Sequence, residues 1–245
     1  MLFKIIVYII SGLGAGIGTG LAGLSAAAVI SPMLITFLGF NAYEAVGIAL
    51  ASDVLASGVS AYTYGKNKHL DIKNGLVMLI SVLIFTLVGS RIASLVMTTF
   101  LGIRFIVKPV MQTGQAQENK TRQRKIIESL LCGVLIGFIC GFIGAGGGMM
   151  LLFVLTGVLG YELKMAVGTS VFIMTFTALT GALSHFAIGG KPDLLALIVC
   201  VLATLIGARG SALFANKATP EKQNRVTGLV LTALGIAMIL VKFVF

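Results

Sequence analysis

Residues Gly141–Phe153 read GFIGAGGGMMLLF and place five glycines within eight residues of an otherwise apolar stretch. Glycine in a helix interior costs about 1 kcal/mol relative to alanine, and it has no side chain to pack. The run therefore indicates one of two structures: a tight contact between helices, or a point where the backbone leaves the helix.

The chain around this run is too apolar for a water-soluble protein. Of its 245 residues 58% are hydrophobic and only 11% are charged, whereas soluble domains have about 25% charged residues. Several apolar runs approach the roughly 20 residues that a helix needs to cross a bilayer: Leu2–Ile10, Ala45–Tyr64, Leu76–Val88, Ile126–Ile143, Met165–Ile188, Leu194–Phe214 and Val226–Phe245. The sequence predicts an all-α, polytopic transmembrane protein.

The net charge of +10 lies mainly in short connections such as GKNKHLDIK and ENKTRQRK. This distribution is typical of cytoplasmic loops and argues against nucleic-acid binding. The three cysteines lie inside apolar runs without metal-ligand spacing, so we expect packing residues and no metal site. We read the first apolar segment as retained in the protein, because no small-residue cleavage site follows it.

The chain is an internal duplication. A shift of 121 residues aligns the glycines of the two halves, Gly12, Gly16, Gly20 and Gly23 with Gly133, Gly137, Gly141 and Gly144, and it aligns the two AVG triplets at 45–47 and 166–168. After a gap of three residues, GSR at 89–91 matches GAR at 207–209. We predict a first transmembrane repeat at 1–111, a polar connecting loop at 112–125 and a second transmembrane repeat at 126–245.

The orientation of the two repeats is open at this stage. Basic connections near residues 65–74, 108–125, 161–164 and 215–225 share one side if the repeats are inverted, and a parallel arrangement gives nearly the same charge asymmetry. We favour inverted repeats with glycine-broken helices, because the long segments Leu2–Leu38 and Ile126–Leu159 can each form a hairpin or two crossings. The segment Leu101–Met111 is the shortest expected crossing.

The glycine run has a chemical interpretation as well as a packing one. Irregular backbone inside a membrane survives only where it faces protein or a cavity. A helix restarting at Met149 would direct free N–H groups at whatever lies there, which suits an anion. We therefore expect Gly144, Gly146, Gly147 and Gly148 to bind substrate, with tight packing as the alternative. In the first half, Ser25 takes the matching place, and a break or helix start is expected near Pro32.

At this point the sequence resembles a known family. GFIGAGGGMMLL, followed by GYELKMAVGTSVFIMTFTALTGALSHF, resembles the sulfite exporter TauE/SafE family of membrane permeases over essentially the whole chain. The resemblance implies export or uptake of sulfite, sulfonates or related small organic anions. The first half departs from the A-V-G-T-S pattern with AVGIALASD at 45–53, which predicts an asymmetric site.

Two groups of polar residues are further candidates for substrate binding or coupling. Thr169 and Ser170 follow Gly168 and either donate to substrate oxygens or bond back to their own helix. Asp53 lies mid-span beside Ser52. Because a fixed carboxylate repels an anionic substrate, we expect Asp53 to couple transport to a proton, with an Arg91 ion pair as the alternative.

The remaining candidates are basic. Arg91 and Arg209 are repeat partners that could neutralise a bound anion or extend to the membrane interface. His185 is a candidate proton shuttle, or it makes a simple capping hydrogen bond.

These observations predict a secondary carrier for small oxyanions in a bacterial-type inner membrane. The expected partners are the lipid bilayer, a small anion and a coupling proton, with no cofactor. The chain has no G-x-x-x-x-G-K-[ST] phosphate loop, and no arrangement of its two histidines and few carboxylates supports an enzyme. A passive anion channel is the alternative, and a membrane-embedded enzyme is the weaker one.

Overall fold

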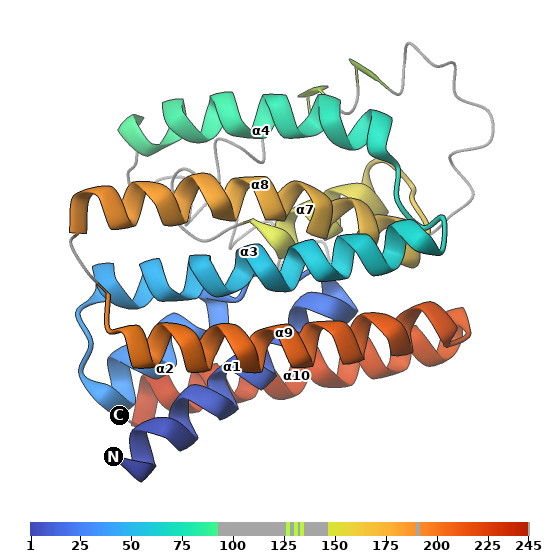
Figure 1. The fold of residues 1–245 in the computed structure, drawn as a ribbon. Coiled ribbons are helices and arrows are strands. Elements are labelled where there is room, and N and C mark those ends of the chain that lie inside the picture. The colour runs from blue at the N-terminus through green and yellow to red at the C-terminus, as the bar shows by residue number, and fades with distance from the viewer. Residues whose placement is uncertain (93–125, 128–129, 132, 135–146, 190–191, 245) are drawn as a thin grey trace.

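The computed structural model of the chain is a bundle of helices, and it describes residues 1–92, 126–127, 130–131, 133–134, 147–189 and 192–244 (Figure 1). Within these ranges the backbone forms helices joined by short connections and contains no strand, which confirms the all-α prediction. Four stretches there are long and apolar enough to cross a membrane: Leu2–Ala22, Ala42–Lys66, Leu163–Leu183 and Leu194–Lys217. The predicted loop 112–125 and the segment Leu101–Met111 lie outside the described residues.

The first half provides α1 (Leu2–Ala22), α2 (Ala27–Leu38), α3 (Ala42–Lys66) and α4 (Ile72–Ile92). Local signals explain their ends. Gly39 stops α2 with a left-handed φ of 68°, and Asn41 begins α3 by accepting the Glu44 N–H at 2.8 Å. The expectation of a break near Pro32 is wrong, because Pro32 lies inside α2 and removes only one backbone hydrogen bond there. The break lies at residues 23–26 instead.

The second half provides α7 (Gly148–Gly157), α8 (Leu163–Gly189), α9 (Leu194–Lys217) and α10 (Pro220–Val244). Its helix starts follow the internal duplication. Helices α2 and α7 begin at residues 27 and 148, and α3 and α8 begin at residues 42 and 163, so both pairs are offset by 121 residues. Equivalent helices therefore start at equivalent positions, although Ala26 before α2 has a φ of −59° and Gly147 before α7 a left-handed φ of 61°.

The repeat-related helices α3 and α8 pack side by side in opposite directions (Figure 1). His185, near the end of α8, contacts Tyr43 at the start of α3, whereas Gly168, near the start of α8, lies against Tyr64 at the end of α3. Opposite directions are what inverted repeats require. The inversion of the complete halves stays a prediction, because residues 93–125 and 135–146 belong to them and are outside the described part.

Glycines in α1 let it pack against α9 at backbone distance. A Cβ atom on Gly12 would lie 2.7 Å from the Ala203 Cβ, and one on Gly16 or Gly20 would overlap backbone carbonyl oxygens of α9. From the other side, a Cβ on Gly207 would lie 2.8 Å from the Leu13 carbonyl oxygen. Small residues one turn apart are the usual means of close helix packing in membranes, so this glycine spacing in α1 serves packing.

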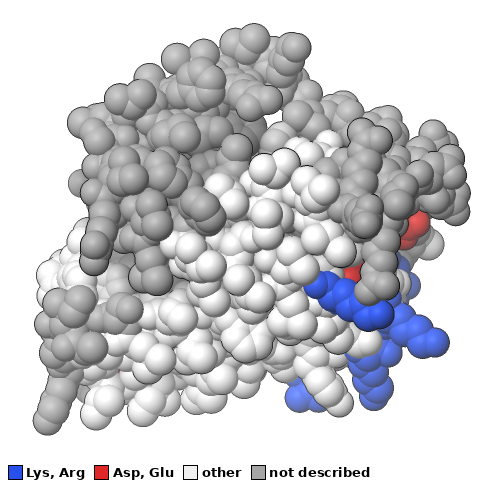
Figure 2. Space-filling view, turned by 90° about the horizontal axis from the view of Figure 1, so that it is seen from above, with Lys and Arg blue, Asp and Glu red and all other residues white. Residues whose placement is uncertain are grey.

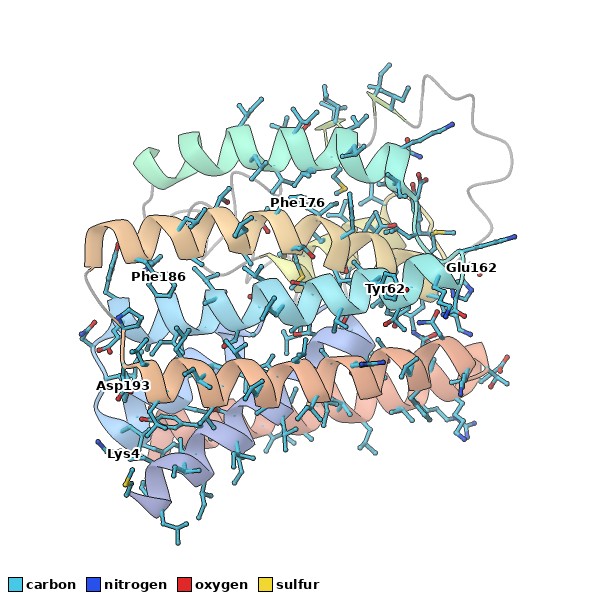
Figure 3. The ribbon with its side chains drawn as sticks, in the orientation of Figure 1. Lys4, Tyr62, Glu162, Phe176, Phe186 and Asp193 are labelled. Atoms are coloured by element: carbon cyan, nitrogen blue, oxygen red, sulfur yellow. The ribbon has the colours of Figure 1, made fainter. Side chains whose placement is uncertain are left out.

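Three of the basic connections meet at one end of the bundle. His69 Nδ1 lies 2.7 Å from Asn216 Oδ1, and Lys164 Nζ donates to the carbonyl oxygens of Asn216 at 3.1 Å and Ala218 at 2.7 Å. On the face shown in Figure 2, Lys and Arg side chains gather at one end. At the opposite end Asp193 donates its N–H to Glu44 at 3.0 Å. Figure 3 labels Glu162 at the basic end and Asp193 at the other.

Candidate functional site

The break between α1 and α2 is a buried turn that begins at Gly23. Gly23 adopts a φ of 62°, and the N–H groups of Gly23 and Leu24 bond to Thr19 and Gly18 at 2.9 and 3.2 Å. Thr19 Oγ1 also donates to the Leu24 carbonyl oxygen at 2.7 Å. These bonds satisfy the end of α1 and turn the chain so that Ser25 is buried in the bundle.

Ser25 connects this break to α3. Its Oγ donates to Asp53 Oδ2 at 2.7 Å, although the two residues are 28 positions apart, and it accepts weakly from the Ala27 N–H at 3.4 Å. Ser25 thus lies between the N-terminus of α2 and a carboxyl group.

The carboxyl group of Asp53 is completely buried and only partly hydrogen-bonded. Its Oδ1 has no hydrogen-bond partner within the described part of the chain. No charged side chain among the described residues interacts with it. Arg91, the ion-pair partner considered from the sequence, has its backbone in α4, and its side chain lies outside the described part. An isolated buried carboxyl group in a membrane span is costly and is a candidate for proton binding.

The second break precedes α7. Gly147 adopts a left-handed φ of 61°, and α7 begins at Gly148, one residue before the expected start. No side chain caps this end of α7. The first N–H groups of a helix have no partner within the helix, so the α7 N-terminus is a potential anion donor set. Gly144 and Gly146, the other two predicted substrate ligands of the run, lie outside the described residues.

The two breaks touch each other in the bundle. A Cβ atom on Gly148 would overlap the Gly23 carbonyl oxygen and lie 2.5 Å from Met174 Sδ, and a Cβ on Gly23 would overlap Ser170 Oγ. The chain therefore needs glycine at both positions for the halves to approach. One residue from each break and Ser170 from α8 form a single contact, which we call the break contact.

The starts of α2 and α7 face side chains of different chemistry. Shifting Asp53 by 121 residues gives Met174, and Met174 lies against Gly148 just as Asp53 lies beside the start of α2. The first helix start thus faces a carboxyl group, whereas the second faces a thioether without charge. The 121-residue shift, which the sequence already shows, makes Met174 the repeat partner of Asp53. Only the contacts in the structure show that each of the two residues lies beside a helix start.

The neighbouring hydroxyl groups separate in space. Ser170 is fully buried, donates to the Val167 carbonyl oxygen at 2.9 Å and lies at the break contact. Thr169 faces another element, because its Oγ1 accepts the Asp71 N–H at 3.2 Å in the α3–α4 connection. Ser52 is buried and bonds back to the Ile48 carbonyl oxygen at 2.9 Å. Of these three, only Ser170 lies where the two breaks meet.

The basic candidates also lie away from the break contact. Arg209 is exposed on α9, so the structure does not bring it to the buried candidates. His185 Nδ1 lies 3.2 Å from the Tyr43 carbonyl oxygen, and its ring stacks on Tyr43 with centroids 4.2 Å apart. This contact is at the start of α3, ten residues before Asp53. A role in holding helix ends fits His185 better than exchange of a proton with Asp53.

The sequence did not predict some polar contacts that the structure shows. Lys164, near the start of α8, donates to the carbonyl oxygens of Asn216 and Ala218 at the end of α9. Tyr161 donates to Asp71 Oδ2 at 2.8 Å, and Asn74 donates to the same oxygen at 2.7 Å. These contacts join the α3–α4 and α7–α8 connections, which are 90 residues apart, and no local pattern signals them.

The structure now gives the positions of residues in the family pattern. The AVGTS stretch lies in the first turns of α8, and the last glycines of the run, Gly147 and Gly148, begin α7. Residues 8–238 match the sulfite exporter TauE/SafE family. The chain belongs to this family. As a family member with several apolar helices it is a multi-pass membrane protein of a transporter family.

Curated relatives agree with the family assignment. The chain is 25% identical to a probable membrane transporter protein of Methanocaldococcus jannaschii, over 95% of this chain and 94% of the relative. It is 26% identical to the probable membrane transporter protein YunE of Bacillus subtilis, over 96% of this chain and 97% of YunE. No solved structure matches the chain.

Proposed function

We propose that the chain is a secondary carrier for a small oxyanion, of the sulfite or sulfonate class, in a bacterial-type inner membrane. The observation that supports this most directly is the break contact between Gly23 and Gly148, where irregular backbone from both halves meets. The family's printed description, sulfite exporter TauE/SafE, supports the substrate class.

The proposed binding site is formed by the N-terminus of α7, Ser170 and Ser25. A buried anion without hydrogen-bond donors costs many kcal/mol. The N–H groups after Gly147 are suitable donors, since this end of α7 has no side-chain cap and faces the uncharged Met174. The hydroxyls of Ser170 and Ser25 add donors from α8 and from the first break.

Asp53 is the proposed coupling group, and Ser25 transmits its protonation state. The Ser25 hydroxyl now donates to Asp53 Oδ2. When Asp53 binds a proton, its negative charge no longer repels an anion, and its carboxyl group no longer requires the Ser25 hydrogen bond. Ser25 is then free to donate to the substrate. This exchange makes proton binding and anion binding mutually favourable, which is the thermodynamic requirement for symport.

The test is transport by purified protein in liposomes. We expect currents on a solid-supported membrane for at least one of sulfite, thiosulfate, sulfoacetate, taurine and phosphate, and stimulation of uptake by the same anion inside. Gly147→Val should abolish transport, because valine cannot adopt the left-handed conformation without strain. Gly210→Val is the matched control, since a Cβ there has nothing within 4 Å.

Two outcomes contradict the proposal. Flux without stimulation by internal anion identifies a channel, in which ions pass independently of a site that alternates between sides. A correctly folded Gly147→Val protein with near-normal flux removes the assignment of the α7 N-terminus to the substrate.

A further inference from the structure

One face of α3 carries a row of buried polar side chains that the proposed substrate site does not use. Asp53, Ser57, Ser60 and Tyr64 are spaced by four, three and four residues, and each is 0% exposed. This spacing puts all four on the same face of a helix. At 1.5 Å per residue the row extends about 16 Å, roughly half the hydrocarbon thickness of a bilayer.

Two atoms in this row have no hydrogen-bond partner within the described residues: Asp53 Oδ1 and Ser60 Oγ. Serine and threonine hydroxyls in helices normally bond back to a carbonyl group one turn earlier. Ser52, Ser57 and Thr63 do so on the same helix. A buried hydroxyl without a partner is destabilising, so the conformation of Ser60 needs an explanation other than stability.

The second half shows that helix packing does not require these polar groups. The positions 121 residues later on α8 are Met174, Ala178, Gly181 and His185. The first three are apolar, although α8 and α3 pack against each other in the same bundle. The polar row is therefore a property of the half that contains Asp53.

We propose that Ser57 and Ser60 form a proton path between Asp53 and the basic end of the bundle, where Tyr64 lies. Side chains three or four residues apart on a helix have Cβ atoms about 5–6 Å apart, which is farther than a direct hydroxyl hydrogen bond of about 2.7–2.8 Å. One water between successive hydroxyls spans this distance. The Tyr64 hydroxyl, which donates to the Gly20 carbonyl oxygen at 2.8 Å, marks the end of the row.

Proton transfer along this row requires no oxidant, reductant or other reactant. Each oxygen accepts one proton and releases its own to the next acceptor, and Asp53 changes from carboxylate to carboxylic acid. The polar groups facing Asp53 are Ser25 and the Ala26 N–H from the first break. Among the described residues, α1, α8 and α9 present no charged side chain to it. The path rests on the proposed proton-coupled function, because it has no purpose if Asp53 is not a proton site.

The test compares Ser60→Ala and the double variant Ser57→Ala/Ser60→Ala with the unaltered chain in liposomes. Counterflow exchange of the transported anion at equal pH on both sides should persist. Accumulation driven by a pH difference, and proton uptake reported by a pH-sensitive dye, should be lost. Thr63→Val is the control and should keep both activities, because the Thr63 hydroxyl already bonds back to the Val59 carbonyl oxygen and lies about 90° around α3 from the centre of the row.

Stability separates this path from a structural role. The Ser60 hydroxyl bonds to no protein group among the described residues, so Ser60→Ala should leave the melting temperature close to that of the unaltered protein. Retained counterflow with unchanged pH-driven accumulation overturns the path alone. A parallel fall of counterflow, accumulation and melting temperature also overturns it, in favour of a structural role. Absence of counterflow in the unaltered protein overturns the proposed function and this path together.

Discussion

Gly148→Ala tests whether the break contact holds the two halves together. Gly148 is the first residue of α7, and its φ is not in the left-handed region, so alanine meets no backbone strain there. The added Cβ would overlap the Gly23 carbonyl oxygen and lie 2.5 Å from Met174 Sδ. Methionine can move, but the Gly23 backbone can move only if the first break moves with it. The two backbones must separate by on the order of 1 Å to reach normal contact distance.

The expected cost follows from this overlap. Overpacking a close contact destabilises by about 1–3 kcal/mol. For a chain of this size 1 kcal/mol corresponds to a shift in melting temperature of about 2–4 °C, so we expect a decrease of about 2–12 °C. Anion counterflow should fall as well, because the proposed donors are on the two segments that are pushed apart.

The assay is thermal unfolding in detergent together with counterflow in liposomes, and Gly210→Ala is the matched control. A Cβ on Gly210 has nothing within 4 Å, and its residue lies in the interior of α9. The same chemical change should therefore stabilise by up to about 1 kcal/mol through helix propensity. A Gly148→Ala protein that melts at or above the unaltered temperature and transports normally would refute the break contact.

Three further predictions concern the same region and its supports. Gly23→Ala should destabilise more than Gly39→Ala in thermal unfolding, because both residues have left-handed φ values but only Gly23 faces a side chain, Ser170, within 4 Å; equal shifts would contradict this. Asp53→Asn should exchange anion in counterflow yet fail to concentrate it under a pH difference, and unchanged pH-driven accumulation rules out its coupling role. Lys164→Met should lower stability by about 1 kcal/mol, because half-buried Lys164 bonds to two carbonyl oxygens at the end of α9. The measurement is a small decrease in melting temperature. An unchanged melting temperature would mean that the loss of hydration of Lys164 offsets these bonds.

Much of the fold follows from local properties of the sequence. Hydropathy over about 20 residues identifies the spans, because the cost of burying polar groups in a bilayer acts on each segment separately. The glycine run predicts the start of α7 to within one residue, since an uncapped helix start with left-handed Gly147 depends only on neighbouring residues. The duplication aligns the start of α2 with that of α7, and it aligns Gly39 with Gly160, which both adopt a left-handed φ, of 68° and 69°. The one local error, at Pro32, arose because packing can compensate a single missing hydrogen bond.

The arrangement of the candidate site depended on the tertiary structure. Thr169 and Ser170 are adjacent in the AVGTS pattern, yet consecutive residues differ by about 100° around a helix, so they face different elements. Only the rotation of α8 in the bundle decides that Ser170 meets Gly23 and that Thr169 meets the α3–α4 connection. Arg209 follows the same rule and faces outward from α9.

The sequence by itself determined that the protein is a duplicated, helical, multi-pass membrane protein with a glycine break before α7, and it identified the family. Only the tertiary structure decided that Ser25 bonds to Asp53 and that Gly23 touches Gly148. The physical reason is the range of the interactions. Helix starts, breaks and membrane insertion are determined within a few residues or one span, whereas contacts between residues 28 or 125 positions apart depend on how whole helices rotate and cross in the packed bundle.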